Sequence, residues 1–106
     1  MDVSSRYEWD AGNLDKCQSH GVTAAEIEQV LDGDPFLVPD YEHSQHEDRH
    51  IAVGFNRSGR PIFVIFTLRL SESKESVRPI SARYMHRKEI EKYDKLWRQE
   101  SPKADD

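Results

Sequence analysis

The chain has 106 residues, of which 36% are hydrophobic and 33% charged, and its net charge at pH 7 is −5. This length predicts one domain over residues 1–106, with a modest core at about 6–98 and a flexible tail at 99–106. No stretch approaches the roughly 18 apolar residues of a membrane span, and no apolar signal segment is present, so we expect a cytoplasmic protein with no membrane partner. Cys17 is the single cysteine, which excludes a disulfide framework and a cysteine-based zinc site.

The charge is divided unevenly along the chain. Residues 1–56 carry three basic and twelve acidic side chains, whereas residues 57–98 carry eleven basic and five acidic ones. A basic second half could attract a polyanion such as a nucleic acid, although the whole chain is acidic. A solvated helix face rich in lysine and arginine is the alternative, and charge alone does not decide between the two.

The first third of the chain predicts a short strand followed by two helices. The aromatic segment 6–10 alternates as a strand does, and Asp10 is a candidate N-cap for a short helix that Gly21 closes. Thr23 and Glu26 have the spacing of a capping box. The helix that follows, 22–33, has apolar residues at helical spacing: Val22, Ile27, Val30 and Leu31.

The rest of the chain predicts four strands and a final helix. The expected segments are strands at 36–40, 51–55, 61–68 and 77–84, a polar loop at 40–48, turns at 57–60 and 70–76, and a helix at 86–99. Pro39 stops the first of these strands or holds it at a sheet edge. The order β-α-α-β-β-β-β-α predicts an α+β fold, in which an antiparallel sheet of four to five strands packs against two N-terminal helices and one C-terminal helix.

The stretch EHSQHEDRH, residues 42–50, contains three histidines. His43, His46 and His50 are three and four residues apart, and zinc is held by three imidazoles in some catalytic sites. However, His50 begins an alternating segment typical of a strand, so the three do not share a helix face, and no partner cysteine exists. Ser44 beside His43 lacks the nucleophile elbow of a hydrolase. These features favour a solvated loop for His46 over a metal site, without excluding one.

Arginines recur within or at the ends of the predicted strands: Arg49, Arg69, Arg78 and Arg83. The planar guanidinium suits a phosphate, because it donates two parallel hydrogen bonds and keeps its charge. Metal-free RNA cleavage needs a base for the 2′-hydroxyl proton, cations for the phosphorane, and an acid for the leaving oxygen. The available proton carriers are His20, His43, Glu47 and His86. The alternative is that these arginines are solvated or paired with the acidic half.

A series of segments taken together resembles the BrnT-type toxin family. In order they are YEWD, HGVTAAEIEQVL, DPFLV, EHSQHEDR, GRPIFVIFTLR and VRPISARYMHRKEIEKY, and they span residues 6–95. The most specific pieces are Trp9-Asp10, His20-Gly21-Val22, and Ser81-Ala82-Arg83 with Glu89 and Tyr93. The resemblance implies a fold similar to RelE-type ribonucleases and a metal-independent endoribonuclease that slows translation. It also implies a cognate BrnA-like antitoxin, a small DNA-binding protein that covers the toxin.

Carried over position by position, the resemblance implies a set of catalytic candidates: His20, Glu47, Arg49, Arg69, Arg83 and Glu89. The candidate RNA-binding residues are Lys16, His43, Arg78, His86 and Arg87. The resemblance also implies no metal ligand and no cofactor, and it leaves His46 and His50 incidental. The chain departs from the family in three places, one of which is its first helix, because other members often have one more residue between the Trp and the His. Family members commonly have a lysine where this chain has Ser19, and Lys16 is the nearest substitute. Pro79 also removes a ladder donor from a strand that is usually free of proline.

Three interpretations stay open at this point. The first is a ribonuclease toxin with RNA as its substrate. The second is a binding or regulatory module with the same fold and degraded chemistry, which Ser19 favours. The third is a structural or metal-binding domain. An exposed sheet edge and apolar helix residues left uncovered in so small a chain also predict association, either as a homo-oligomer or with a partner.

Overall fold

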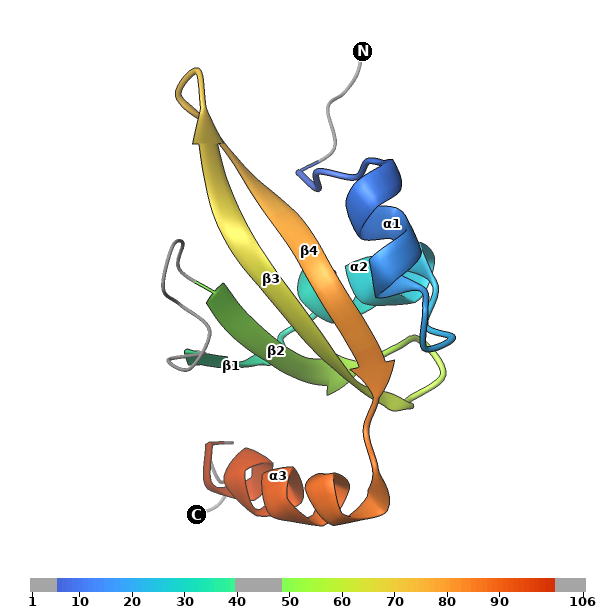
Figure 1. The fold of residues 1–106 in the computed structure, drawn as a ribbon. Coiled ribbons are helices and arrows are strands. Elements are labelled where there is room, and N and C mark those ends of the chain that lie inside the picture. Colours follow the sequence, from blue (N-terminus) through green and yellow to red (C-terminus); the bar gives the residue numbers. More distant parts are fainter. Residues whose placement is uncertain (1–5, 40–48, 101–106) are drawn as a thin grey trace.

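The structure is a computed structural model, which describes residues 6–39 and 49–100. Its elements are α1 (Ala11–Cys17), α2 (Ala24–Asp32), β1 (Phe36–Pro39), β2 (Arg49–Phe55), β3 (Pro61–Ser71), β4 (Lys74–Tyr84) and α3 (Arg87–Glu100). The strands form one antiparallel sheet in the order β1-β2-β3-β4 (Figure 1). The α+β layout expected from the sequence is therefore confirmed. None of the described helices has the length and apolar character needed to cross a bilayer.

The segment 6–10 contributes a single bridge instead of the predicted strand. Tyr7 pairs with Val77 in parallel, and no further pairing follows. The reason lies in the start of α1, where Asp10 caps the helix and forms a capping box with Asn13. The side-chain amide of Asn13 also donates to two backbone carbonyls, that of Glu8 in the segment 6–10 and that of Pro79 in β4. These hydrogen bonds satisfy the local backbone groups without a sheet ladder, so the predicted strand is reduced to one bridge. The predicted N-cap at Asp10 is confirmed.

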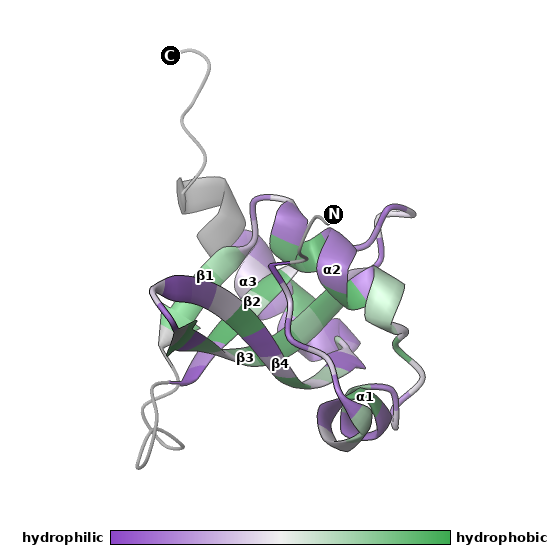
Figure 2. Ribbon diagram, turned by 90° about the horizontal axis from the view of Figure 1, so that it is seen from above, coloured by the Kyte–Doolittle hydropathy of each residue, from purple (hydrophilic) through white to green (hydrophobic). Residues whose placement is uncertain are grey.

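The main core lies between α2 and one face of the sheet. The predicted capping box of Thr23 and Glu26 begins α2. The core residues are Val22, Ile27, Val30 and Leu31 from the α2 region, with Ala52, Ile62, Val64, Phe66 and Ala82 from the strands. The apolar parts of the strands and of α2 lie together in Figure 2. Cys17 is buried in the same core, and burial raises the pKa of its thiol to about 11, so it is a packing residue.

The hairpin of β3 and β4 is longer than the sequence predicted. A polar turn was expected over 70–76, but pairing continues to Ser71 and resumes at Lys74. Glu72 and Ser73 alone form the turn, and both have positive φ, 51° and 66°. Two such residues define the type I′ geometry that fits the twist of a hairpin. The polar side chains of this segment therefore lie on a projecting ribbon, and the loop there is short.

A β-bulge interrupts the pairing of β3 with β4. The register passes from Ser81 to Pro79 between consecutive residues of β3, which leaves Ile80 as an extra residue. The carbonyl of Pro79 accepts a hydrogen bond from Asn13 of α1. Since the backbone N and O of one strand residue point to the same side, Pro79 turns its missing N–H away from β3. The expected loss of a ladder donor does not arise.

The bulge also decides which side chains of β4 share a face. Arg78 and Arg83 are five residues apart and would point to opposite faces in a regular strand. Arg78 lies opposite Thr67, and Arg83 opposite Phe63, and these two residues of β3 are four apart. Both arginines therefore lie on the face turned away from α2. We call it the groove face.

Candidate active site

Two cavities open on the groove face. Cavity A has a volume of about 370 Å³ and is lined by His20, Ile51, Phe63, Ile65, Ser81, Ala82, Arg83 and Tyr93. Cavity B has a volume of about 190 Å³ and is lined by Gly12, Asn13, Lys16, Arg49, Arg78 and Ile80. The sheet register makes them neighbours, because the row Ile51–Ile65–Ser81 adjoins the row Arg49–Thr67–Arg78. Adjacent rows on one face are about 7 Å apart.

Arg83 is held in one orientation in cavity A. Its Nη1 and Nη2 donate to the two carboxylate oxygens of Glu89 at 2.8 and 2.7 Å. The guanidinium carbon lies 4.6 Å from the centroid of the Phe63 ring. Among the described residues, nothing occupies the second fork of donors, formed by Nε and the remaining hydrogen of Nη2. Arg83 can therefore still bind an oxyanion with two hydrogen bonds.

Glu89 is a fixed anion. Hydrogen bonds from Arg83, supported by the backbone N–H of His86 at 2.9 Å, lower the pKa of Glu89 to about 2. The same pair raises the pKa of Arg83. A carboxyl with so low a pKa accepts a proton poorly near neutrality. The geometry therefore favours Glu89 as the residue that orients Arg83, in preference to a general base.

His20 reaches cavity A from the turn after α1. Gly21 follows it with a φ of +92°, which L residues rarely adopt. The hydroxyl of Tyr84 donates to Glu26 of α2 at 2.9 Å and lies 3.4 Å from the carbonyl oxygen of Gly21. Burial opposes ionisation of Glu26, but its hydrogen bonds outweigh burial and hold its pKa below the ordinary value. This network fixes the turn, so that His20 and Arg83 line the same cavity.

The cations of cavity B are partly balanced by carboxylates. Arg78 donates to Asp10 at 2.8 Å and to Glu8 at 3.3 Å. The bond from Arg78 lowers the pKa of Asp10, which remains an anion beside the cavity. Arg49 and Arg78 flank Thr67 in one row, with their Cα atoms about 10 Å apart, and Lys16 faces the same cavity from α1. Cavity B therefore gathers basic side chains from three elements.

Other predicted residues lie outside these cavities. Arg69 is exposed on the groove face, opposite Ser76, and lies about 20 Å along β3 from Phe63. The arginines are therefore spread along the groove face and do not all surround one phosphodiester. His86 and Arg87 are exposed at the start of α3 and line neither cavity. The predicted residues His43 and Glu47, like His46, lie outside the described part of the chain.

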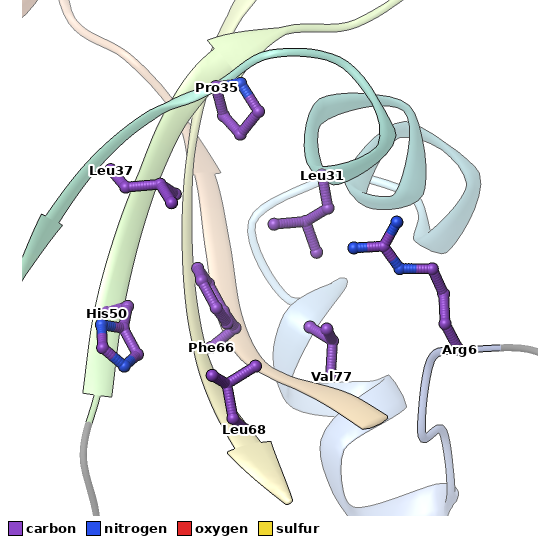
Figure 3. A pocket seen from close by; sticks show the side chains of 8 residues that line it. All are labelled: Arg6, Leu31, Pro35, Leu37, His50, Phe66, Leu68 and Val77. Atoms are coloured by element: carbon purple, nitrogen blue, oxygen red, sulfur yellow. The ribbon is translucent and has the colours of Figure 1, made fainter. Parts of the chain in front are cut away.

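A third cavity, of about 280 Å³, opens on the other side of the sheet (Figure 3). Leu31, Leu37, Phe66, Leu68 and Val77 give it an apolar lining, completed by Arg6, Pro35 and His50. His50 alternates with Arg49 along β2, so it faces away from the groove face and packs 5.4 Å from the ring of Phe66. Within the described residues, no group of His, Cys, Asp and Glu is arranged to hold a metal ion.

Several residues of cavity A were not predicted as site residues: Ile51, Phe63, Ile65, Ser81 and Tyr93. Tyr93 packs edge-on against Phe63 and Phe36, with ring centroids 5.6 and 6.2 Å apart. A signal was available, because Phe63 and Ile65 share a strand face and Tyr93 lies on the apolar face of the predicted helix. Core residues show the same two patterns, so the sequence alone does not distinguish these cavity residues from core residues.

The fold and the two cavities define a small α+β protein with a basic groove on one face of its sheet. The family model described as "Ribonuclease toxin, BrnT, of type II toxin-antitoxin system" matches residues 9–89. A search among curated proteins found no match. The chain belongs to the BrnT family of ribonuclease toxins of type II toxin–antitoxin systems, which confirms the resemblance seen in the sequence.

Proposed function

We propose that this protein is a metal-independent endoribonuclease of the cytoplasm that inhibits translation by cleaving RNA and is neutralised by a cognate BrnA-like antitoxin. One observation carries the proposal. A single cavity brings together a histidine, His20, and an arginine, Arg83, whose guanidinium is fixed by Glu89 and keeps one fork of donors for a substrate. Membership of a ribonuclease toxin family gives independent support.

The reaction uses the nucleophile that RNA itself carries. His20 accepts the proton of the 2′-hydroxyl, and the 2′-oxygen forms a bond to phosphorus. Arg83 stabilises the charge of the phosphorane through its Nε–Nη2 fork. The bond from phosphorus to the 5′-oxygen then breaks, and that oxygen takes a proton from an acid, for which Glu47 and His43 are the candidates. The products are a 2′,3′-cyclic phosphate and a 5′-hydroxyl.

The basic residues of cavity B, with Arg69 beyond them, hold the RNA to one side of the reacting phosphate. Lys16, Arg49 and Arg78 lie one row from cavity A, and Arg69 lies one row further along β3. A row spacing of about 7 Å lets successive rows meet successive phosphates of an extended strand. Because each phosphate contact releases counterions, binding should weaken steeply as salt is added.

The test is cleavage of single-stranded RNA by the purified protein in the presence of a metal chelator. Cleavage should persist in chelator and fall by about 100- to 1,000-fold in Arg83→Ala, the size of effect seen when one oxyanion donor is removed. Arg57→Ala, which changes an exposed arginine in the turn between β2 and β3, is the control and should keep full activity. Loss of cleavage in chelator would show the metal-free mechanism to be wrong.

The toxin assignment is tested in cells. Induction of the wild-type chain should arrest bacterial growth, and co-expression of the antitoxin should relieve the arrest. Arg83→Ala should allow growth without the antitoxin while the protein accumulates at the same level. Growth arrest by Arg83→Ala equal to that of the wild type would separate toxicity from the proposed chemistry.

A second candidate function is an RNA- or protein-binding module with degraded chemistry. Ser19 favours it, because its hydroxyl donates to the carbonyl of Lys16 at 2.8 Å and supplies no cation where relatives commonly have lysine. If that lysine is required, the wild type should bind RNA without cleaving it. Ser19→Lys should then restore cleavage, and its failure to change an inactive wild type would count against this explanation.

A further inference from the structure

We infer that cavity A takes up one unpaired nucleobase of the RNA, so that the substrate is single-stranded or looped RNA held by stacking as well as by charge. This inference rests on the proposed function and names its substrate class. The starting observation is the lining of the cavity. Beside the polar pair of His20 and Arg83, the cavity is lined by half-buried apolar and aromatic side chains: Ile51, Phe63, Ile65 and Tyr93.

A phosphate does not explain this lining. Placing a phosphate anion against aliphatic side chains removes it from water without compensating hydrogen bonds, which is unfavourable. A nucleobase has two flat apolar faces, and stacking on an aromatic side chain contributes about 1–3 kcal/mol per base. A volume of about 370 Å³ is near the lower end of small-molecule sites, which suits one nucleotide.

The lining is also not an ordinary part of the core. Ile62 and Val64 of β3 are 0% exposed on the α2 face, whereas their neighbours Phe63 and Ile65 stay accessible on the groove face. Tyr93 of α3 packs against Phe63 and, together with Ile65, lines the open space of cavity A. Apolar surface kept accessible in a concave site indicates a ligand.

The polar groups orient the nucleotide. Arg83 lies over the Phe63 ring at one wall, so the phosphate belongs on that side and the base on the side of Ile65. Ser81, opposite Ile65 in the ladder, offers a hydroxyl that can donate to or accept from the edge of a base. A base in this position cannot be paired or stacked within a duplex, which excludes double-stranded substrate.

The experiment uses a 2′-O-methyl oligoribonucleotide, which has no free 2′-hydroxyl and cannot be cleaved. Its affinity for the wild-type protein is measured by fluorescence anisotropy and compared with oligonucleotides that carry one abasic site, moved along the strand. One position should weaken binding by about tenfold when its base is removed. No loss at any position, or no binding of any oligonucleotide, would overturn the inference.

A matched pair of variants locates the effect. Ile65→Phe fills cavity A and should weaken binding of the intact oligonucleotide by about tenfold while leaving the abasic one unchanged. Leu68→Phe, on the other face of the same strand, should change neither. Tyr93→Leu, which keeps apolar bulk but removes the ring, should show the same selective loss as Ile65→Phe. Equal weakening of both oligonucleotides by these variants would overturn the base pocket.

The two proposals fail separately. If ordinary RNA is not cleaved, the proposed reaction is wrong, yet the binding difference between intact and abasic oligonucleotides still measures the pocket. If RNA is cleaved but no abasic position weakens binding, the proposed reaction is supported and the base pocket is wrong. Circular dichroism of each variant confirms that it is folded before either result is interpreted.

Discussion

Neighbouring apolar side chains on the two faces of β3, over residues 62–65, are buried to different extents. On the α2 face, Ile62 and Val64 have no exposed surface; on the groove face, the intervening Phe63 and Ile65 are only half-buried. The helix α2 lies against the first face, and on the second Tyr93 of α3 packs edge-on against Phe63. The alternation of one strand thus separates the residues that stabilise the fold from those that line the site.

The largest expected effect is on stability. Ile62→Ala should lower the free energy of unfolding by about 2–5 kcal/mol, because it leaves a cavity in a closely packed core. Ile65→Ala, the same change on the groove face, should cost about 1 kcal/mol, because part of this side chain is already in contact with water. Urea denaturation measures both. Equal losses would show that the groove face is packed as core and would remove the distinction between the faces.

The next effect is on catalysis. Arg83→Lys keeps the positive charge but loses both the paired hydrogen bonds to Glu89 and the fork for phosphate, so RNA cleavage should slow by roughly tenfold or more. Stability should change little. Arg60→Lys is the matched control, since Arg60 stacks on Tyr84 at 3.5 Å and lines neither cavity A nor cavity B. An unchanged cleavage rate in Arg83→Lys would mean that the positive charge of Arg83 is sufficient and that its paired hydrogen bonds are not required.

A pair of glycines tests how the turn places His20. Gly21 and Gly59 have φ values of +92° and +87°, and an added methyl group meets no close atom at either position. Alanine at each should therefore lower stability by a similar amount, about 1–2 kcal/mol, through backbone strain. Gly21→Ala alone should also slow RNA cleavage, because the strain acts beside His20. Thermal denaturation and cleavage rates measured on both variants separate the two effects.

The smallest effect is the pH dependence of the Arg83–Glu89 pair. The pKa of Glu89 lies at about 2, below its ordinary value of 4.5, so the pair stabilises the folded state above pH 4.5. This contribution is lost as pH falls from about 4.5 towards 2. Solvent screening limits it to about 1 kcal/mol or less. Glu89→Gln should flatten that part of the stability curve, and a wild-type curve already flat there would contradict the shifted pKa.

Much of the fold follows from short-range chemistry that is visible in the sequence. Asp10 and Thr23 mark helix starts, and the apolar periodicity of residues 22–31 matches the buried side of α2. Two features escaped prediction: the first depends on a partner distant in sequence, and the second places residues of loop-like polar composition in a strand. The segment 6–10 meets β4 at one bridge, and the polar residues at 70–76 continue a ladder that ends in a two-residue turn.

The candidate site was predictable in part. His20 and Arg83 are chemically apt residues, and the structure places both in cavity A. The ion pair of Arg83 with Glu89 joins the end of β4 to the start of α3, so neither strand periodicity nor helix periodicity predicts it. Arg78 and Arg83 share a face because Ile80 is an extra residue between them. A prediction from regular strand alternation would place them on opposite faces.

The bulge at Ile80 has a consequence for how this chain tolerates sequence change. Loss of that one codon would leave a regular ladder in which Arg78 and Arg83, then four residues apart, still share the groove face and Ala82 still faces α2. Substitution of Ile80 and its in-frame deletion should therefore both be mild, whereas one further residue inserted between Ser81 and Arg83 would turn Arg83 towards the apolar interior.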